Sequence, residues 1–313
     1  MPKNKKKQEN WWFWLVIGLV ASLMIAPNTT VIRVLVGQIQ PLEFTLLRSA
    51  LIVIVSMPFV LISIRKFNRR NLVFTLGAGV SMTIATISLV YAVKYSGASY
   101  AAIMGLVSPI LLVILSSRFM GDKISPRAVA GVALAAAGAF IVVALPLAAS
   151  GQSSTHFYPL ATTLMLINSL FFTLGTLFSR KSNEAGMPLM ANSGLMSVII
   201  ATVSFACMYA VEGLPTDIGH FSINTWVGIF YSGVVVVYLA RVMSIASFER
   251  VGAAATSGLS YLGTIISVLI PIIVLGEKLS STIISGGAVI LVGVYLTEKH
   301  RAKHQHHKYM HAH

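Results

Sequence analysis

Cysteine and acidic residues are scarce in this sequence. It contains 1 cysteine, Cys207, and 9 acids against 23 lysines and arginines in 313 residues. A single cysteine excludes an intramolecular disulfide and a cysteine-based metal cluster. Charged residues make up 10% of the chain, where a soluble protein carries about a quarter. The sequence therefore lacks the charged surface that is typical of a soluble globular protein.

Motifs for nucleotide binding and for nucleophilic chemistry are also missing. No phosphate-binding loop, no Ser/His/Asp constellation and no pair of acids falls within an apolar stretch. We therefore expect no enzyme activity, no cofactor, no metal site and no ATP-driven pumping by this chain alone. The net charge of +14 would favour a nucleic-acid partner in a soluble protein, but the basic residues lie between apolar runs. We expect no nucleic-acid partner.

Long apolar runs make up most of the sequence. Hydrophobic residues account for 56% of the chain, and the mean hydropathy is +0.82. About 20 apolar residues in a helix span the roughly 30 Å hydrocarbon core of a bilayer. Ten segments of this kind lie at 11–34, 41–64, 71–93, 99–119, 126–147, 158–179, 187–211, 222–247, 253–275 and 280–297. The pattern predicts an all-α integral membrane protein with ten transmembrane helices in a lipid bilayer.

The positive residues indicate how these helices are oriented. With the N-terminus in the cytoplasm, eighteen lysines and arginines fall in inside connections and three, Arg33, Lys94 and Lys278, fall outside. Cytoplasmic loops carry the excess of positive charge in membrane proteins. We therefore expect both termini in the cytoplasm and a multi-pass protein of the cell (plasma or inner) membrane. The lysine-rich start resembles a signal peptide, but no clean cleavage site follows it, so we expect a retained first helix.

An internal repeat relates the two halves of the chain. A shift of 155 residues places Gly121-Asp-Lys-Ile-Ser125 on Gly276-Glu-Lys-Leu-Ser280, and Gly131 and Gly138 on Gly286 and Gly293. Each repeat holds five segments, an odd number, so the two halves have opposite orientations in the membrane. Inverted repeats of this kind are the architecture of alternating access. The repeat predicts a transporter.

Several motifs resemble those of a known family. They are Asn28, Pro41-Leu-Glu-Phe-Thr-Leu-Leu-Arg48, Tyr91-Ala-Val-Lys-Tyr-Ser-Gly-Ala-Ser99, Ser108-Pro109, Ser260-Tyr-Leu262, Gly276-Glu-Lys-Leu279 and the paired glycines. Together they make the sequence similar to the EamA branch of the drug/metabolite transporter superfamily, over roughly residues 11–297 in two copies. The resemblance implies a carrier of amino acids or other small metabolites, in most members an exporter.

The expected domains follow from the repeat. They are a basic cytoplasmic N-terminus (1–10), a first five-helix repeat (11–147), an external linker (148–157), a second five-helix repeat (158–297) and a His-rich cytoplasmic tail (298–313). His300 and His304 have a spacing that would clamp a metal ion if the tail were helical. Because cysteine and acidic ligands are absent between Lys299 and His313, we expect instead a disordered cationic tail beside anionic lipid.

Arg48 is the most informative single residue. It lies about 10 Å into the second segment, at 1.5 Å per residue from Pro41. A cation at this depth is a functional candidate. One interpretation is contact with substrate, and the other is a structural role, in which Arg48 bonds main-chain carbonyls freed where Pro27 interrupts the first segment. Asn28 lies at a similar depth and fits either interpretation.

Glu43 is the candidate for ion coupling, because it is the one acid that could reach the pathway from a predicted helix. It lies near the outer boundary and about 140° around the helix from Arg48. A solvated ion pair with Arg33 or Lys94 is the alternative. With no other titratable group at membrane depth, the sequence favours facilitated diffusion or exchange over strict proton antiport.

Further polar side chains fall within the predicted helices. Asn168 would line the pathway or bond a neighbouring helix. The tyrosines at membrane depth would stack on substrate or fill helix interfaces; they are Tyr91, Tyr231, Tyr238 and Tyr261. A central cavity lined by Asn28, Arg48, Asn168 and Tyr261 is the site hypothesis. Six glycines should let helices approach closely, namely Gly97, Gly105, Gly131, Gly138, Gly286 and Gly293.

These observations predict a secondary transporter, an exporter of small metabolites such as amino acids. The principal alternative is an exporter of lipophilic cations or drugs, which would be served by a carboxylate deep in the membrane. A membrane receptor or scaffold is a further alternative, but it would not account for the inverted repeat.

Overall fold

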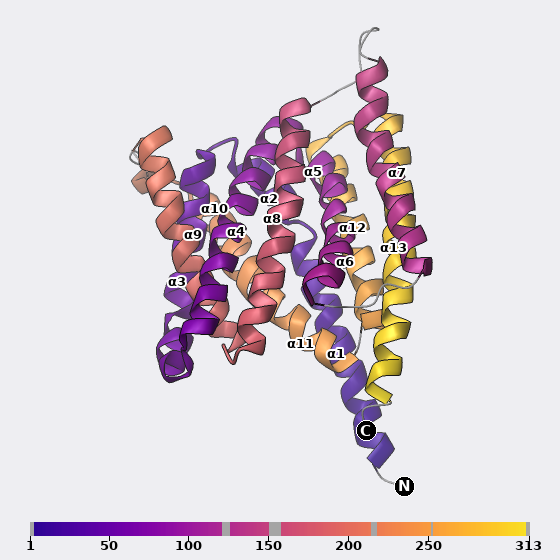
Figure 1. The fold of residues 1–313 in the computed structure, drawn as a ribbon. Helices are drawn as coiled ribbons and strands as arrows, with labels where there is room; N and C mark the ends of the chain where they lie inside the picture. Colours follow the sequence, from indigo (N-terminus) through magenta and orange to yellow (C-terminus); the bar gives the residue numbers. More distant parts are fainter. Residues whose placement is uncertain (1–2, 121–125, 150–157, 214–217, 252, 311–313) are drawn as a thin grey trace. The chain divides into compact units, whose positions relative to one another are not determined.

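Helices form along almost all of the described chain. The computed structural model describes residues 3–120, 126–149, 158–213, 218–251 and 253–310, and this part contains no strand (Figure 1). Some side chains within helices, that of Tyr261 and those of residues 297–310 among them, lie outside the described residues. The all-α expectation is confirmed.

The helices follow the predicted segments closely. They are α1 (Lys3–Ile25), α2 (Asn28–Leu35), α3 (Pro41–Ser63), η1 (Ile64–Lys66), α4 (Arg69–Ser96), α5 (Ala98–Gly105), α6 (Val107–Met120), α7 (Pro126–Ala149), α8 (Pro159–Glu184), α9 (Leu189–Val211), η2 (Ile218–His220), α10 (Ile223–Phe230), η3 (Tyr231–Ala240), α11 (Arg241–Val251), α12 (Ala253–Leu275) and α13 (Ser281–Met310). The helical backbone of α13 runs through most of the tail, so the expectation of a disordered tail is wrong up to Met310.

Proline, asparagine and glycine set several helix ends. Proline occupies the first helical position of α3 and of α8, where its missing N–H costs no hydrogen bond. The side chain of Asn68 caps α4 in a reciprocal pair with Asn71. Gly97 ends α4 with a φ of +97°, which only glycine adopts readily. Gly97 is therefore a turn residue, and its predicted role in helix packing stays a prediction.

Three predicted segments are interrupted within their length. Helix α1 ends before Pro27 and α2 begins after it, as expected, because proline cannot donate to the carbonyl four residues earlier. Helices α5 and α6 are separated at Leu106. Pro109 lies four residues after Gly105 and has no N–H to donate to the carbonyl of Gly105. In the third case, α10 continues into the π-helix η3 and then α11. A π-helix bonds each N–H five residues back and is rare outside single turns.

Seven helical stretches of the described residues are long and apolar enough to cross a membrane. They are Trp12–Leu35, Pro41–Lys66, Arg69–Ser96, Ala98–Phe119, Pro159–Glu184, Leu189–Val211 and Ile223–Ser247. Three shorter apolar helical stretches, Val129–Val142, Leu262–Leu275 and Ser281–Leu296, coincide with the other predicted segments. The number of ten transmembrane helices remains a prediction.

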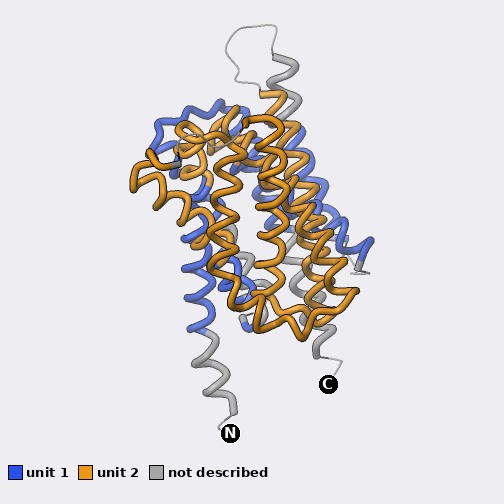
Figure 2. Tube along the Cα trace, turned by 90° about the vertical axis from the view of Figure 1, so that its left-hand side faces the viewer, with its two compact units in different colours: residues 1–28, 102–157, 239–313 blue, residues 29–101, 158–238 orange. Residues whose placement is uncertain are grey.

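The chain folds into two compact units that cut across the sequence repeats. Unit 1 comprises residues 1–28, 102–157 and 239–313, and unit 2 comprises residues 29–101 and 158–238 (Figure 2). Each unit takes helices from both repeats. Within the helices, the chain passes from one unit to the other beside Pro27, inside α5 and inside η3, so these crossings coincide with the interrupted segments.

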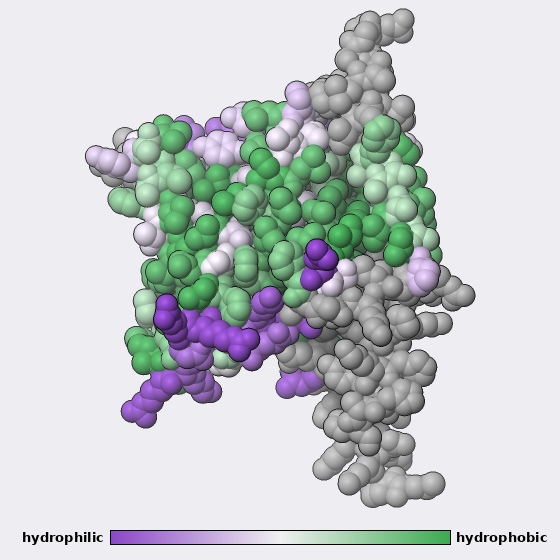
Figure 3. Space-filling view, viewed as in Figure 1, coloured by the Kyte–Doolittle hydropathy of each residue, from purple (hydrophilic) through white to green (hydrophobic). Residues whose placement is uncertain are grey.

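In unit 2, α4 packs against α8 and α9, and α3 packs against α9. Ala78, Met82, Met196 and Ile200 form the core of these contacts, with Phe178 against them. Hydrophobic side chains cover the middle of this unit's visible face, and hydrophilic ones gather where α3 joins α4 (Figure 3). Four exposed basic residues, Arg65, Lys66, Arg69 and Arg70, lie at that junction. An apolar belt above a basic end suits a lipid bilayer.

In unit 1, α7 and α13 approach closely through glycines. A Cβ on Gly138 would lie 2.6 Å from the main-chain nitrogen of Ile290 and 2.8 Å from the carbonyl oxygen of Gly286. The predicted packing role of Gly138 and Gly286 is therefore confirmed. Gly105 is different, because a Cβ there would meet nothing within 4 Å among the described residues. The expectation that Gly105 permits a close helix approach is wrong.

Candidate substrate site

Arg48 lies on the part of α3 that packs against the start of η3. Its side chain is 4% exposed, and its Nη1 donates to the hydroxyl of Ser232 at 3.3 Å. The guanidinium carbon lies 5.2 Å from the centre of the Phe44 ring, one helical turn earlier on the same face. The bond to Ser232 differs from the structural interpretation of Arg48, which named main-chain carbonyls beside Pro27.

Gly233 allows the backbone of η3 to approach Arg48. A Cβ at Gly233 would lie 2.7 Å from Cγ of Arg48 and 2.8 Å from its carbonyl oxygen. Ser232 and Gly233 are the second and third residues of the π-helix. The wider turn of a π-helix changes which side chains face a neighbouring helix, and such turns occur often at functional sites. In the sequence, both residues lie in an apolar run, and nothing in that run indicates that they are close to Arg48.

Glu212 holds the first turn of α3. Its carboxylate accepts hydrogen bonds from the N–H of Leu42 at 3.2 Å and of Glu43 at 3.3 Å. The hydroxyl of Tyr91 donates to the same carboxylate at 2.8 Å. An acid at a helix N-terminus satisfies free amides and faces the positive end of the helix dipole. Sequence reasoning missed Glu212 because it follows directly after the predicted segment 187–211.

The basic residues near this end of α4 bind main-chain and amide oxygens. Arg33 donates to the carbonyls of Val93 and Lys94, at 3.1 and 2.6 Å. Lys94 donates to the side-chain oxygen of Gln40 at 3.4 Å. Both basic side chains therefore bind main-chain or amide oxygens and not the carboxylate of Glu43, with which an ion pair was the alternative. Cations near the last carbonyls of a helix are favourable, so these contacts stabilise the end of α4.

The other candidate residues are spread over both units. Asn168 is buried and donates from its amide to the carbonyl of Ala85 at 2.8 Å. Tyr238 packs against Phe59, with 6.5 Å between ring centres. Its hydroxyl has no hydrogen-bond partner among the described residues. Asn28 begins α2 and is half-buried. The side chain of Tyr261 lies outside the described residues.

The candidates Arg48, Tyr91, Asn168 and Tyr238 do not form one contacting group among the described residues. Among the described residues, no hydrogen bond or ring contact joins Arg48 to Asn168, Tyr91 or Tyr238. Asn168 and Tyr91 instead join α8 and α9 to α4. These contacts correspond to the alternative named for Asn168, a bond to a neighbouring helix. Arg48 and Tyr238 are the described candidates that retain unused hydrogen-bonding capacity in a buried position.

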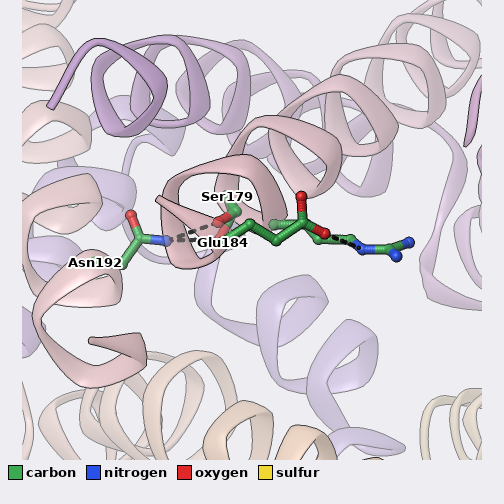
Figure 4. A network of polar contacts seen from close by, with 4 residues as sticks. Ser179, Glu184 and Asn192 are labelled. Atoms are coloured by element: carbon green, nitrogen blue, oxygen red, sulfur yellow. Dashed lines mark hydrogen bonds and ion pairs between the residues drawn. The ribbon is translucent and has the colours of Figure 1, made fainter. Parts of the chain in front are cut away.

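A dense polar network lies at the opposite end of unit 2. The amide nitrogen of Asn192 on α9 points to Ser179 on α8 (Figure 4), 2.9 Å from its hydroxyl. The hydroxyl of Thr75 on α4 donates to Asn192 at 2.9 Å and lies 2.8 Å from the hydroxyl of Ser182. Glu184, drawn beside them, pairs instead with Arg180 at 3.1 Å. Buried groups that satisfy one another in this way fix helix positions.

The described residues contain no group of three or more histidine, cysteine or acidic side chains placed to hold a metal ion. The histidine side chains of the tail lie outside the described residues, so the structure does not test whether they bind a metal ion.

Long apolar helices and a belt of exposed apolar side chains define a multi-pass membrane protein. The model of the EamA-like transporter family matches residues 12–144 and 159–298. The chain belongs to this family, and it shows the family's two-repeat pattern. It is therefore a membrane transporter of the drug/metabolite type.

One solved structure, described only as "Crystal structure of protein", has the same fold. It matches with a TM-score of 0.59 and 17% sequence identity, over 95% of this chain and 99% of that chain. No curated protein matches the sequence.

Proposed function

We propose that this protein is a secondary transporter that exports small metabolites, such as amino acids or related compounds. The proposal includes ten transmembrane helices as two inverted five-helix repeats, both termini in the cytoplasm, and location in the cell membrane. Alternating access between states of similar energy is what inverted repeats provide. Support comes from the family's two matched regions and from the concentration of basic residues where α3 joins α4.

The observation that carries the proposal is the buried cation on α3. Arg48 is 4% exposed in a helix long and apolar enough to span the membrane. A structural arginine in such a position usually binds carbonyls or an acid. Arg48 instead donates to one hydroxyl, that of Ser232. Its remaining N–H groups are available for a substrate, since a guanidinium carries five.

The other candidate residues differ in how readily their side chains could bind a substrate. Tyr238 offers a buried hydroxyl, whereas Tyr91 and Asn168 would first have to leave their bonds to Glu212 and Ala85. Asn28 and Tyr261 stay as predicted contributors. Glu43 stays as the predicted coupling candidate, in the first turn of α3.

Export of lipophilic cations is the competing function, and the described residues of unit 2 do not favour it. A cation entering this unit would meet the positive charge of Arg48. The carboxylate of Glu212, which could attract a cation, already accepts bonds from two amides and from Tyr91.

Counterflow in proteoliposomes tests the proposal. Vesicles loaded with an unlabelled amino-acid mixture should take up traces of labelled amino acids, whereas empty vesicles and vesicles without protein should not. Arg48→Ala should abolish the uptake, and Lys66→Ala, on an exposed side chain, should leave it intact. Uptake of labelled lipophilic cations instead of amino acids would establish the competing function.

A further inference from the structure

We infer that the turn between α3 and α4 is a binding site for the phosphate headgroup of an anionic phospholipid. This basic turn presents four exposed cationic side chains, Arg65, Lys66, Arg69 and Arg70. The inference goes beyond the proposed export function and does not depend on the substrate, because it uses only the membrane location of the protein.

The four cations of the basic turn have no acidic partner. None of them forms an ion pair with a described residue, and the sequence contains no acid between Glu43 and Asp122. Of the described acids in unit 2, Glu184 pairs with Arg180 at 3.1 Å. The other two, Glu43 and Glu212, lie at the opposite end of α3. Four like charges within six residues repel one another, so an anion bound among them is favourable.

The basic turn lies at the depth of lipid headgroups. Helix α3 has 23 residues, which give a length of about 34 Å at 1.5 Å per residue. This length is close to the roughly 30 Å thickness of the hydrocarbon core. If α3 begins at one surface of the core, it therefore ends at the other surface, where η1 and the first turn of α4 follow.

Exposed apolar side chains adjoin the basic turn on both helices. Ile62 near the end of α3 is 80% exposed, and Val73 in the second turn of α4 is 59% exposed. Hydrophilic side chains gather where α3 joins α4, and hydrophobic ones cover the face beside them (Figure 3). A phospholipid has the matching arrangement, a phosphate next to acyl chains. A soluble anion would leave the apolar side chains uncovered, so a lipid fits this surface better.

Two of the cations lie where a helix disfavours positive charge. Arg69 and Arg70 are the first two residues of α4, and the first turn of this helix contains no acid. The N-terminus of a helix carries a partial positive charge, which makes cations there unfavourable and anions favourable. A phosphate would compensate both the helix terminus and the guanidinium groups, which bind phosphate oxygens through paired N–H donors.

Hydrogen bonds hold the backbone of the basic turn. The side-chain amide of Asn71 donates to the carbonyl of Lys66 at 3.0 Å. The side chains of Asn68 and Asn71 each accept from the other residue's main-chain N–H. Asn68 also donates to the carbonyl of Ala185, which follows α8, at 3.2 Å. A backbone that is fixed before binding loses little entropy when a headgroup binds.

Short-chain lipids added to the purified protein test the inference. The protein in a neutral detergent is titrated with dioctanoyl phosphatidylglycerol or dioctanoyl phosphatidylcholine, and the melting temperature is measured at each concentration. Phosphatidylglycerol should act at a concentration at least about ten-fold lower, because the choline group carries a positive charge that the basic turn repels. Equal effects of the two lipids would overturn the inference.

The headgroup alone distinguishes a lipid from a soluble anion. Glycerophosphoglycerol, which is the same headgroup without acyl chains, should not change the melting temperature at the concentrations where the lipid acts. An effect equal to that of the lipid would identify a soluble phosphate compound as the ligand and would overturn the inference.

A matched pair of lysine variants locates the site. Lys66→Gln should raise the half-maximal concentration of phosphatidylglycerol about five-fold, which is the contribution of one basic residue near an anionic lipid surface. Lys278→Gln makes the same change at an exposed lysine of unit 1 that directly follows Glu277, and it should leave this concentration unchanged. Equal weakening in both variants would show a general effect of net charge and would contradict a site at the basic turn. The proposed ligand is lipid and not substrate, so Lys66→Ala remains a control for substrate uptake.

A double variant tests the two arginines of α4. Arg69→Gln/Arg70→Gln should raise the half-maximal concentration of phosphatidylglycerol about 25-fold, as the product of two single effects. Without lipid, this variant should melt no lower than the unmodified protein, because the substitutions remove cations from the positive end of a helix. An unchanged half-maximal concentration would show that the lipid does not bind at the basic turn.

Discussion

The carboxylate of Glu212 lies 3.2 Å from the main-chain nitrogen of Leu42 and 2.8 Å from the hydroxyl of Tyr91. Glu212 directly follows α9, and these bonds connect it to the first turn of α3 and to α4, all within unit 2. A residue at the end of α9 therefore serves as the N-terminal cap of a helix about 170 positions earlier in the chain.

The Glu212 cap should contribute measurably to stability. Glu212→Ala should lower the free energy of unfolding by about 1–2 kcal/mol, because two amides lose their acceptor and the helix dipole loses its counter-charge. Thermal unfolding of the purified protein in one detergent is the measurement. Tyr91→Phe removes one of the three donors and should have a smaller effect; an unchanged melting temperature in Glu212→Ala would show that water replaces the cap.

The contact between α7 and α13 should be sensitive to a single methyl group. Gly138→Ala places a Cβ 2.6 Å from the nitrogen of Ile290, and overpacking of this kind costs about 1–3 kcal/mol. Gly105→Ala is the matched control, since its Cβ meets nothing within 4 Å among the described residues. The first variant should melt lower, and the second should be unchanged or slightly more stable; equal melting temperatures would contradict the packing described for unit 1.

The polar network around Asn192 should depend on its amide. Asn192→Ala leaves the buried hydroxyls of Thr75 and Ser179 without that partner, at about 1–3 kcal/mol for each unsatisfied group. Thr202→Ala, on an exposed face of the same helix, should have little effect. Comparison of their unfolding temperatures tests the network, and a small effect of Asn192→Ala would mean that the hydroxyls find other partners.

The proposed orientation has a direct test. Cysteine in place of Lys278 should react with a membrane-impermeant maleimide added outside intact cells, whereas cysteine in place of Lys66 should react only after the membrane is opened. The reason is the bias of basic residues toward cytoplasmic connections. Labelling of the Lys278→Cys protein only from the cytoplasm would contradict both the ten-helix topology and the inversion of the repeats.

Transport should not require a proton gradient. Among the described acids, Glu43 lies in the first turn of α3 and Glu212 follows α9, so neither lies in the middle of a span. We expect counterflow at equal pH and no additional accumulation when a pH gradient is imposed. Gradient-driven accumulation that disappears in Glu43→Gln would establish Glu43 as the coupling residue.

Helix positions were largely predictable from hydrophobic length. The segments predicted at 41–64 and 187–211 correspond to α3, Pro41–Ser63, and α9, Leu189–Val211. Proline at 27 also predicted an interruption correctly. The break at Leu106 could have been inferred from Pro109, but the π-helix could not, because a change in hydrogen-bond register leaves the average hydropathy of a run unchanged.

The candidate site was predictable only in part. Arg48 stands out in the sequence because a cation in an apolar segment is rare. Its partner Ser232 is 184 positions away, and no local periodicity relates the two. Glu212 and Leu42 pose the same problem, as do Thr75 and Asn192. Side-chain contacts across such separations depend on the relative rotation of packed helices, which a single sequence does not encode locally.

The interleaving of the repeats also constrains biosynthesis. Helix α4 is synthesised before α8 and α9. The hydroxyl of Thr75 can therefore form its hydrogen bonds to Ser182 and Asn192 only after these later helices have been made. The nascent first half is consequently an assembly intermediate with unmet polar groups in an apolar solvent. A chain severed between residues 150 and 157 would yield two fragments, neither of which holds a whole compact unit. Recovery of the fold would then require both fragments to be inserted in the same bilayer and to complement each other.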